Sequence, residues 1–433
     1  MNFVESNIER AARNASEHWL KDLELQVGGL RLLYILGNVS LPLNNINTTI
    51  VELVSHLIHG NVCHVIALGP GHTDEVFMHL QKELGVEPVW CTHRSGSPKL
   101  RAEIRQLASG QPKSFLLADT VAFAESLDRS LARGVDVVHL VGFSTLGDHV
   151  RRLASEAAVV LTLPDAMSLV YQNYATRPSV ALPARCRARI SAAIYRRAEK
   201  DLLPLVDAVH VVAETDATYL RESFGLENLF VIPPLVPHRV FENAEDPSSP
   251  DADRSDLLLL RPDADGARWF WGEVWPILTS GGRSLRLTVF GAEADRSFLE
   301  SQHKGVRFAS SCPDFHQMVR QHKVALMVDM NAEHGILNRS LHAMAAGSAV
   351  VGTPASFRGI DVVNGIHCFQ ESSASGFVQK VDLLLRNGDL RKEMGVAARM
   401  RMHEGYSCSN LVPRFLSMYQ EVLVRRRKAQ NSA

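Results

Sequence analysis

The chain has 433 residues, of which 46% are hydrophobic, and its 46 Lys and Arg nearly balance its 47 Asp and Glu. This length indicates two or three domains with separate cores. The balanced charge excludes a basic field that gathers nucleic acid, and no apolar run reaches the roughly 18 residues that a membrane-spanning helix needs. The polar first residues do not resemble a signal peptide, and the six scattered cysteines contain no C-x-x-C pair. These features predict a cytoplasmic protein with free thiols.

The first half of the chain alternates apolar runs with helical patterns. Residues 4–25 predict a helix that packs on the first domain, with an interaction helix as the alternative. Near-continuous apolar runs of this kind are typical of a parallel sheet that is covered by helices on both faces. Strands are expected at 31–37, 62–69, 87–91, 114–118, 135–142, 157–163, 204–214 and 229–235.

A second alternation follows a polar stretch that has the composition of a linker. Helices are expected at 269–278 and around 337–346, and an amphipathic helix ends the chain. Strands are expected at 257–260, 285–291, 305–309, 324–330 and 348–353. The sequence thus predicts an N-terminal Rossmann-like domain over 1–242 with a leading helix at 1–30, a linker over 243–256, a C-terminal Rossmann-like domain over 257–408, and a helix with a basic tail over 409–433.

The predicted fold class is α/β, with two doubly wound Rossmann-like domains facing across a cleft. In open parallel sheets, ligands bind in the crevice at the carboxyl ends of the strands. The sequence therefore predicts a ligand site at these ends.

One segment, 334–353, carries polar residues on a helix that is entered through Gly335. A helix N-terminus presents free N–H groups and the positive end of the helix dipole, which suits a phosphate. Arg339 adds a cation whose fork geometry matches diphosphate oxygens, and Asn338 and His342 can bind whatever is attached. The alternative is that Arg339 is a solvated charge and His342 a surface residue.

The stretch "GILNRSLHAMAAGSAVVGTPASFRGI" (335–360) resembles the donor-binding segment of retaining glycosyltransferases with the GT-B fold, family 4. Other segments resemble parts of that family in the same order, and the likeness covers most of residues 31–425. These segments are 135–142, 159–169, 196–220, 268–278 and 285–291.

The resemblance implies a site for a nucleotide-diphosphate sugar. Asn338, Arg339 and Ser340 would line the diphosphate, and Gly335 would open the helix. Arg339 would stabilise the negative charge that grows on the leaving diphosphate. Gly291 would let a strand end approach the nucleotide base.

The resemblance also places residues on the sugar and ribose sides. His139 would follow a strand at the cleft edge and, with Asp165, face the sugar or the acceptor. The family carries two glutamates separated by seven residues, and these positions hold His334 and His342 here. His342 would take the ribose side, although one histidine nitrogen cannot accept two hydrogen bonds as a carboxylate can. Glu333 lies one residue from the first position.

Two further positions depart from the family. Asp265 precedes Gly266 where the family has Lys-Gly, so an anion would lie beside a diphosphate unless Arg261 substitutes for the lysine. Pro164 stands where histidine is common and offers neither a proton nor an N–H group. Asp165 is retained.

The sequence therefore predicts a retaining, metal-independent glycosyltransferase that uses a nucleotide-diphosphate sugar as donor and no other cofactor. Its acceptor would be a glycan, a lipid-linked molecule, a protein or a small molecule. The competing hypothesis is a catalytically inactive glycosyltransferase-like protein that serves as a partner or binding subunit.

Several other signals are weak. Asp-x-Asp at 251–253 and 263–265 is a metal-diphosphate clamp in another glycosyltransferase fold, but neither copy is expected to bind metal. "GPGH" at 69–72 is an incomplete dinucleotide motif, which leaves a dehydrogenase as another alternative. The 18 histidines contain no H-E-x-x-H, so a metal hydrolase has no support. Basic clusters within 185–197 and at 425–428 predict contact with an acidic acceptor or the inner membrane face, or else solvated helix faces.

Overall fold

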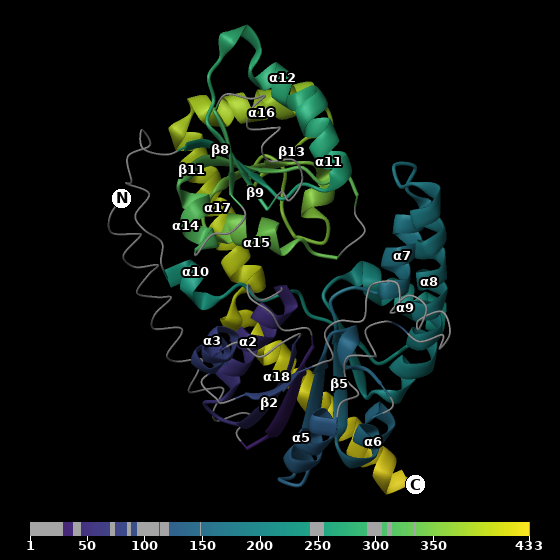
Figure 1. Cartoon of the computed structure of the whole chain (residues 1–433). Helices are drawn as coiled ribbons and strands as arrows, with labels where there is room; N and C mark the ends of the chain where they lie inside the picture. The colour runs from purple at the N-terminus through teal and green to yellow at the C-terminus, as the bar shows by residue number, and fades with distance from the viewer. Residues whose placement is uncertain are drawn as a thin grey trace. The chain divides into compact units, whose positions relative to one another are not determined.

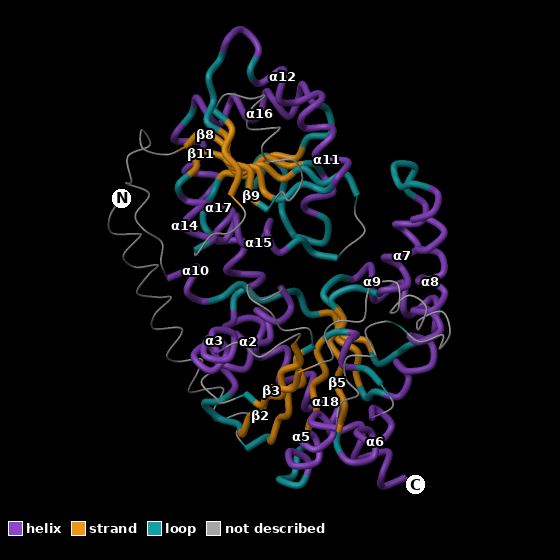
Figure 2. Tube along the Cα trace, in the orientation of Figure 1, coloured by secondary structure: helices purple, strands orange, loops and turns teal. Residues whose placement is uncertain are grey.

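The computed structural model describes residues 29–37, 45–69, 74–84, 88–92, 112, 121–147, 149–242, 255–291, 305–309, 314–331 and 335–432. The chain divides into two units, Met1–Leu235 with Cys408–Ala433 and Val236–Ser407. Each unit has a central sheet with helices against it (Figures 1 and 2). Because the described strand pairs are all parallel, the predicted α/β class with two doubly wound domains is confirmed.

The first sheet has the order β3-β2-β1-β4-β5-β6-β7. Its strands are β1 (Arg31–Leu36), β2 (Val62–Gly69), β3 (Val89–Thr92), β4 (Val137–Val141), β5 (Ala158–Leu163), β6 (Ala208–Val211) and β7 (Leu229–Val231). Its helices are α2 (Asn45–Leu57), α3 (Asp74–Leu84), α5 (Val121–Leu131), α6 (His149–Glu156), α7 (Met167–Thr176), α8 (Leu182–Leu202), α9 (Glu214–Phe224) and α18 (Cys408–Ser432). The predicted helix at 4–25 and strand at 114–118 lie outside the described residues.

Strand β1 shows why the apolar runs are continuous. Leu32, Tyr34 and Leu36 point to one face of the sheet and enter one core cluster, whereas Leu33 and Ile35 enter the cluster on the other face. Side chains alternate between faces along a strand, so a strand that is covered on both sides needs apolar residues at every position. Full burial of such a side chain contributes about 1.5–3 kcal/mol.

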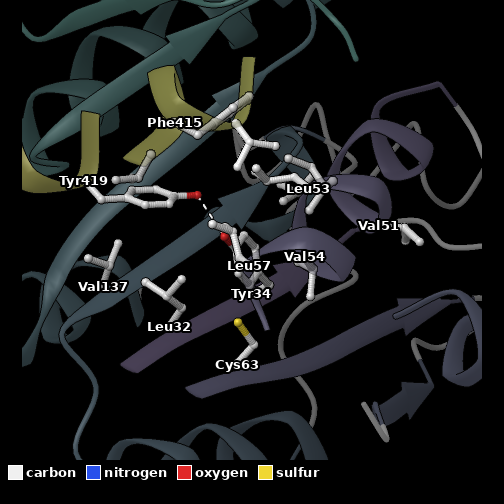
Figure 3. Close-up of a cluster of buried hydrophobic side chains, with 14 of the residues drawn as sticks. Leu32, Tyr34, Val51, Leu53, Val54, Leu57, Cys63, Val137, Phe415 and Tyr419 are labelled. Carbon is white, nitrogen blue, oxygen red and sulfur yellow. Dashed lines mark hydrogen bonds between the residues drawn. The ribbon is translucent and has the colours of Figure 1, made fainter. Parts of the chain in front are cut away.

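The last helix, α18, completes the core of the first unit. Phe415 and Tyr419 are buried against the face of the sheet that carries Tyr34 and Leu32 (Figure 3). The hydroxyl groups of Tyr34 and Tyr419 are hydrogen-bonded at 3.0 Å. The sequence predicts a separate helix and tail over 409–433, whereas the structure includes this segment in the first unit.

The structure moves the first predicted boundary from residue 242 to Leu235. Val236 and Val240 are buried in a core cluster of the second unit, and the Val236 N–H donates to the Tyr406 carbonyl at 2.9 Å. The short helix α10 (His238–Glu242) thus belongs to the second unit. Residues 243–254 of the predicted linker lie outside the described part of the chain.

The second sheet has the order β10-β9-β8-β11-β12-β13. Its strands are β8 (Ser255–Leu260), β9 (Leu287–Phe290), β10 (Val306–Ala309), β11 (His322–Met327), β12 (Ala349–Gly352) and β13 (Phe369–Gln370). Its other helices are α11 (Ala264–Trp269), α12 (Trp275–Leu278), α14 (Phe315–Arg320), α15 (Asn338–Ala345), α16 (Ala374–Arg386) and α17 (Gly388–Tyr406). A π-helical turn, Phe270–Val274, joins α11 to α12, so the predicted helix at 269–278 is present with a local change of pitch. The sequence does not predict β13, because a strand of two residues is too short to show a pattern of apolar and polar side chains.

None of the helices in the described ranges is both long and apolar enough to cross a lipid bilayer.

Candidate functional site

Four neighbouring connections of the second unit begin at the same edge of its sheet. Arg261 follows β8, Gly291 follows β9, Val328 and Asp329 follow β11, and Thr353 follows β12. The strands are parallel and adjacent in the sheet, so their carboxyl ends lie together. We call the residues at these strand ends the carboxyl edge of the second unit. The helix α15 lies in the connection between β11 and β12.

Arg339 lies in the first turn of α15 and pairs with the carboxylate of Asp329. The Arg339 side chain is 24% exposed, whereas the Asp329 side chain is 4% exposed. Burial raises the pKa of Asp329, and the Arg339 guanidinium acts in the opposite direction. Arg339 is thus a fixed cation at the carboxyl edge and not the solvated charge that the sequence left as an alternative.

Hydroxyl groups hold Asp329 from the other side. Ser356 Oγ donates to Asp329 Oδ2 and accepts from the Asp329 N–H, both at 3.1 Å. Thr353 Oγ1 donates to the Asp329 carbonyl at 2.5 Å. Ser340 is fully buried and donates to the Ser356 carbonyl at 2.8 Å. The prediction that the Ser340 side chain lines a diphosphate is therefore wrong, because its hydroxyl supports the loop after β12.

The helix α15 starts at Asn338, which is 6% exposed. Leu337 occupies the N-cap position, and no side chain within the described ranges caps this end of the helix. Gly335 is buried just before it. An uncapped helix N-terminus presents backbone N–H groups and a positive partial charge. His334 and Glu333 lie outside the described residues.

The carboxylates of the second Asp-x-Asp copy join two connections at the carboxyl edge. Asp263 caps α11 by accepting from the Gly266 N–H at 2.6 Å, and its other oxygen accepts from the backbone and side chain of Asn331, both at 2.9 Å. Asp265 accepts from the Asn331 side chain at 2.8 Å and pairs with Arg268. The charge of Asp265 is thus offset within the protein.

Replacing Gly266 with alanine should destabilise this edge. A Cβ atom there would lie 1.8 Å from the Val328 carbonyl oxygen, so the backbone of one connection must move. Overpacking of this kind costs about 1–3 kcal/mol or more. Urea unfolding measures the loss, and Gly272→Ala is the matched control because its Cβ would meet no atom within 4 Å. Equal stability of the two variants would contradict the close approach.

Arg261 and Gly291 adopt unusual backbone conformations side by side. Arg261 has φ +36°, the only positive value of a non-glycine residue in the described chain, and Gly291 has φ +78°. A Cβ atom on Gly291 would lie 3.2–3.3 Å from the Arg261 side chain. Strained non-glycine residues cluster at functional sites. Gly291 thus makes room for Arg261, the cation that the sequence offers in place of the family's lysine.

His342 pairs with a histidine that the sequence did not single out. His342 Nδ1 lies 2.8 Å from His316 Nε2, and the rings stack with centroids 5.1 Å apart. Burial lowers the pKa of His316 to about 4 and that of His342 to about 3. Both rings are therefore neutral at pH 7. His342 is a partly buried, paired residue and not the surface residue of the alternative interpretation.

The predicted position of His139 is wrong. It is the third residue of β4 and 1% exposed, so it does not follow the strand at an open edge. Its Nδ1 lies 2.6 Å from the Tyr419 hydroxyl and its Nε2 lies 2.6 Å from Thr162 Oγ1. Both ring nitrogens are used inside the core, because a strand interior that is covered on both faces has no access to ligand.

The proton positions around His139 follow from a buried carbonyl. The Ile232 carbonyl must accept from His210 Nε2, at 2.8 Å, so a neutral His210 accepts at Nδ1 from Thr162, also at 2.8 Å. Thr162 then accepts from His139 Nε2, and His139 Nδ1 accepts from the Tyr419 hydroxyl. Burial lowers the pKa of both histidines, that of His210 to about 4. The chain of hydrogen bonds is satisfied only when both rings are neutral.

Two acidic residues lie near the carboxyl ends of the first sheet. Asp165 follows β5 and is partly buried. Glu199 of α8 is fully buried and accepts from the Ser168 N–H at 3.0 Å and from its hydroxyl. Burial raises the pKa of Glu199 to about 7. Sequence reasoning missed Glu199, because one glutamate in a polar helix gives no signal of burial.

Comparisons with known proteins agree with this architecture. Residues 259–387 match the model of the family described as glycosyl transferases group 1. Comparison with curated proteins gave no match.

Several solved structures share the fold over nearly the whole chain. The sucrose-phosphate synthase of Thermosynechococcus elongatus is 12% identical, with a TM-score of 0.62 over 91% of this chain and 100% of that chain. A glycosyltransferase from Rickettsia africae ESF-5 is 14% identical, with a TM-score of 0.59 over 92% and 99%. Anabaena Alr3699/HepE, solved in complex with UDP, is 9% identical, with a TM-score of 0.56 over 93% and 100%. The protein therefore has the GT-B fold of these structures, and residues 259–387 of its second unit are similar to the group 1 glycosyl transferases.

Proposed function

We propose that this protein is a retaining, metal-independent glycosyltransferase that transfers a sugar from a nucleotide-diphosphate donor. The donor would bind at the carboxyl edge of the second unit, within the segment that matches the family. No other cofactor takes part in the proposed reaction. The acceptor would be a glycan, a lipid-linked molecule, a protein or a small molecule.

The observation that carries this proposal is the position of Arg339. Arg339 lies in the first turn of α15, beside a helix N-terminus without a side-chain cap, and the Asp329 carboxylate holds its guanidinium in place. Backbone N–H groups and a guanidinium together suit the oxygens of a diphosphate.

This arrangement suits the electrostatics of sugar transfer. In the reaction the bond between the anomeric carbon and the diphosphate oxygen breaks, the acceptor hydroxyl bonds to that carbon, and the hydroxyl proton is released. Negative charge grows on the leaving diphosphate. A cation that is already held in place stabilises this charge without reorganisation at the moment of reaction. Arg339 would play this part, and Arg261 would supply a second cation from the end of β8.

The His316–His342 pair supports a role on the ribose side. Asp314 Oδ1 lies 3.8 Å from His316 Nδ1, which favours a proton on that nitrogen. His316 Nε2 then accepts from His342 Nδ1, and the lone pair of His342 Nε2 is an acceptor. A ribose hydroxyl can donate to this nitrogen, as it would to the family's glutamate.

Specific observations favour the second candidate, an inactive glycosyltransferase-like partner subunit. Asp329 already neutralises Arg339, and His342 already pairs with His316. A donor must therefore bind at a site whose charge is largely balanced.

A location in the cytoplasm stays a prediction. Contact of the basic clusters with an acidic acceptor or with the inner face of a membrane also stays a prediction.

Calorimetry with a panel of UDP-, GDP- and TDP-sugars tests the proposal. We expect one class of nucleotide sugar to bind, with UDP-sugars tried first because a structure with this fold was solved with UDP. Arg339→Ala should abolish the binding. No binding to any nucleotide sugar would favour the inactive partner, and binding of NAD(H), seen by fluorescence quenching, would favour a dehydrogenase.

A further inference from the structure

Three potential metal ligands of the first unit, none of which takes part in the site described above, lie together. Glu52 and His56 are on α2, and Cys408 is the first residue of α18. One ligand atom from each residue lies within 4.8 Å of the other two. We call this group the Glu52–His56–Cys408 cluster. Carboxylate oxygen, imidazole nitrogen and thiolate sulfur are the three ligand types that zinc uses in proteins.

The spacing of two of these atoms fits a tetrahedral ion. Cys408 Sγ donates to Glu52 Oε1 at 3.5 Å. An ion with a Zn–S bond of about 2.3 Å and a Zn–O bond of about 2.0 Å, at a tetrahedral angle, separates sulfur from oxygen by about 3.5 Å. A zinc ion can therefore take the place of the proton that the thiol now shares with the carboxylate.

The backbone prepares His56 to act as a ligand. His56 Nδ1 lies 2.8 Å from the Glu52 carbonyl oxygen. A carbonyl only accepts, so Nδ1 carries the hydrogen in the neutral ring and the lone pair lies on Nε2. Metal-binding histidines usually have their second nitrogen fixed by a carbonyl or carboxylate in this way. The i, i+4 spacing places Glu52 and His56 on the same face of α2.

The surroundings allow an ion to enter and be retained. Cys408 is buried, whereas Glu52 and His56 are partly exposed. Neighbouring residues of both helices, Leu53 and Leu411 among them, are packed in one hydrophobic cluster. The cluster therefore has an apolar side and a solvent side.

We propose that the Glu52–His56–Cys408 cluster binds Zn²⁺, with water as the fourth ligand. The balanced step is release of the thiol proton as the sulfur–zinc bond forms, while the carboxylate and imidazole bind through existing lone pairs. A mixed sulfur, nitrogen and oxygen set favours zinc over Mg²⁺ or Ca²⁺, which prefer oxygen ligands alone. The proposal is independent of the proposed function, since sugar transfer at the second unit does not use this ion.

The place of Cys408 gives the ion a structural role. The chain passes from the second unit to the first between Ser407 and Cys408. Zinc would tie the first residue of α18 to α2, so binding would stabilise the docking of α18 on the first unit. The sequence predicted no metal site because Glu52 and Cys408 are 356 residues apart, and no spacing motif spans such a separation.

Metal titration of the full chain tests the proposal. After removal of metal with a chelator, we expect one equivalent of Zn²⁺ to bind in competition with a chromophoric chelator and to raise the melting temperature. Co²⁺ should give a thiolate-to-metal charge-transfer band. Cys408→Ser should abolish the band, and His56→Gln should weaken binding more than about 10-fold.

Cys186→Ser is the matched control, because Cys186 is an exposed free cysteine on α8. This variant should keep the band and the stoichiometry. A band that persists in Cys408→Ser, or the absence of stoichiometric Zn²⁺ binding by the folded wild-type chain, would overturn the proposal. Glu52→Gln gives a second measure if Cys408→Ser does not fold, since it should weaken binding while the thiolate band is retained.

Discussion

Arg339→Ala should lower kcat/KM for sugar transfer by roughly 10²–10³-fold, the effect expected when a fixed donor to a developing negative charge is lost. The same change should also destabilise the second unit by about 3 kcal/mol, because it leaves the buried Asp329 carboxylate without its cation. Nucleotide-sugar turnover and urea unfolding measure the two effects separately.

A double variant separates catalysis from charge neutralisation. Asp329→Asn in the Arg339→Ala background removes the uncompensated charge while it keeps the shape of the side chain, so most of the lost stability should return. Activity should stay low, because the cation is still missing. If the double variant recovers both stability and activity, Arg339 only neutralises Asp329, and its proposed role at the diphosphate is wrong.

The stability that neutral His210 gives the first unit should be lost as the pH is lowered from about 6.5 to 4, while buried Glu199, whose pKa is raised to about 7, acts in the opposite direction. Burial lowers the pKa of His210 from 6.5 to about 4, so between these values the unfolded chain binds a proton that the folded chain does not. The stabilisation by neutral His210 is fully present above pH 6.5 and is lost as the pH falls from 6.5 to about 4. At about 1.36 kcal/mol per pKa unit, His210 alone accounts for about 3 kcal/mol, and the lowered pKa of His139 acts in the same direction.

His210→Gln provides the control for this pH dependence. Glutamine can donate to the Ile232 carbonyl and accept from Thr162, but it does not titrate. The variant should therefore lose stability less steeply below pH 6.5 than the wild type does. Because His316 and His342 also have lowered pKa values, hydrogen exchange should be followed on peptides from β4 to β6. Identical pH profiles of these peptides in the wild type and in His210→Gln would contradict the proton assignment.

The sequence predicted the elements better than their contacts. Apolar runs located β1 and β11 to within a few residues, since burial on both faces demands continuous apolar strands. The helix α15 was located because Gly335 precedes it and Gly347 follows it. The sequence around His139 indicates a core position, because Val138 precedes it and Leu140 follows it within one apolar strand.

The remaining parts of the site depend on contacts between distant segments. Nothing in the sequence near Asp329 indicates that its carboxylate meets Arg339, and His316 lies on a different helix from His342. Cys408 meets Glu52 only because α18 returns to the first unit. Such pairings are set by topology and side-chain packing, which a local pattern does not encode.

The contribution of α18 to the first sheet also affects the order of events during translation. The ribosome releases β1 to β7 long before it makes Phe415 and Tyr419, so one face of that sheet lacks the part of its cover that α18 supplies while the whole second unit is synthesised. The second unit, whose residues are contiguous, can close its core first. The nascent N-terminal half then presents an apolar surface for the duration of that interval, and this surface is a natural target for chaperones.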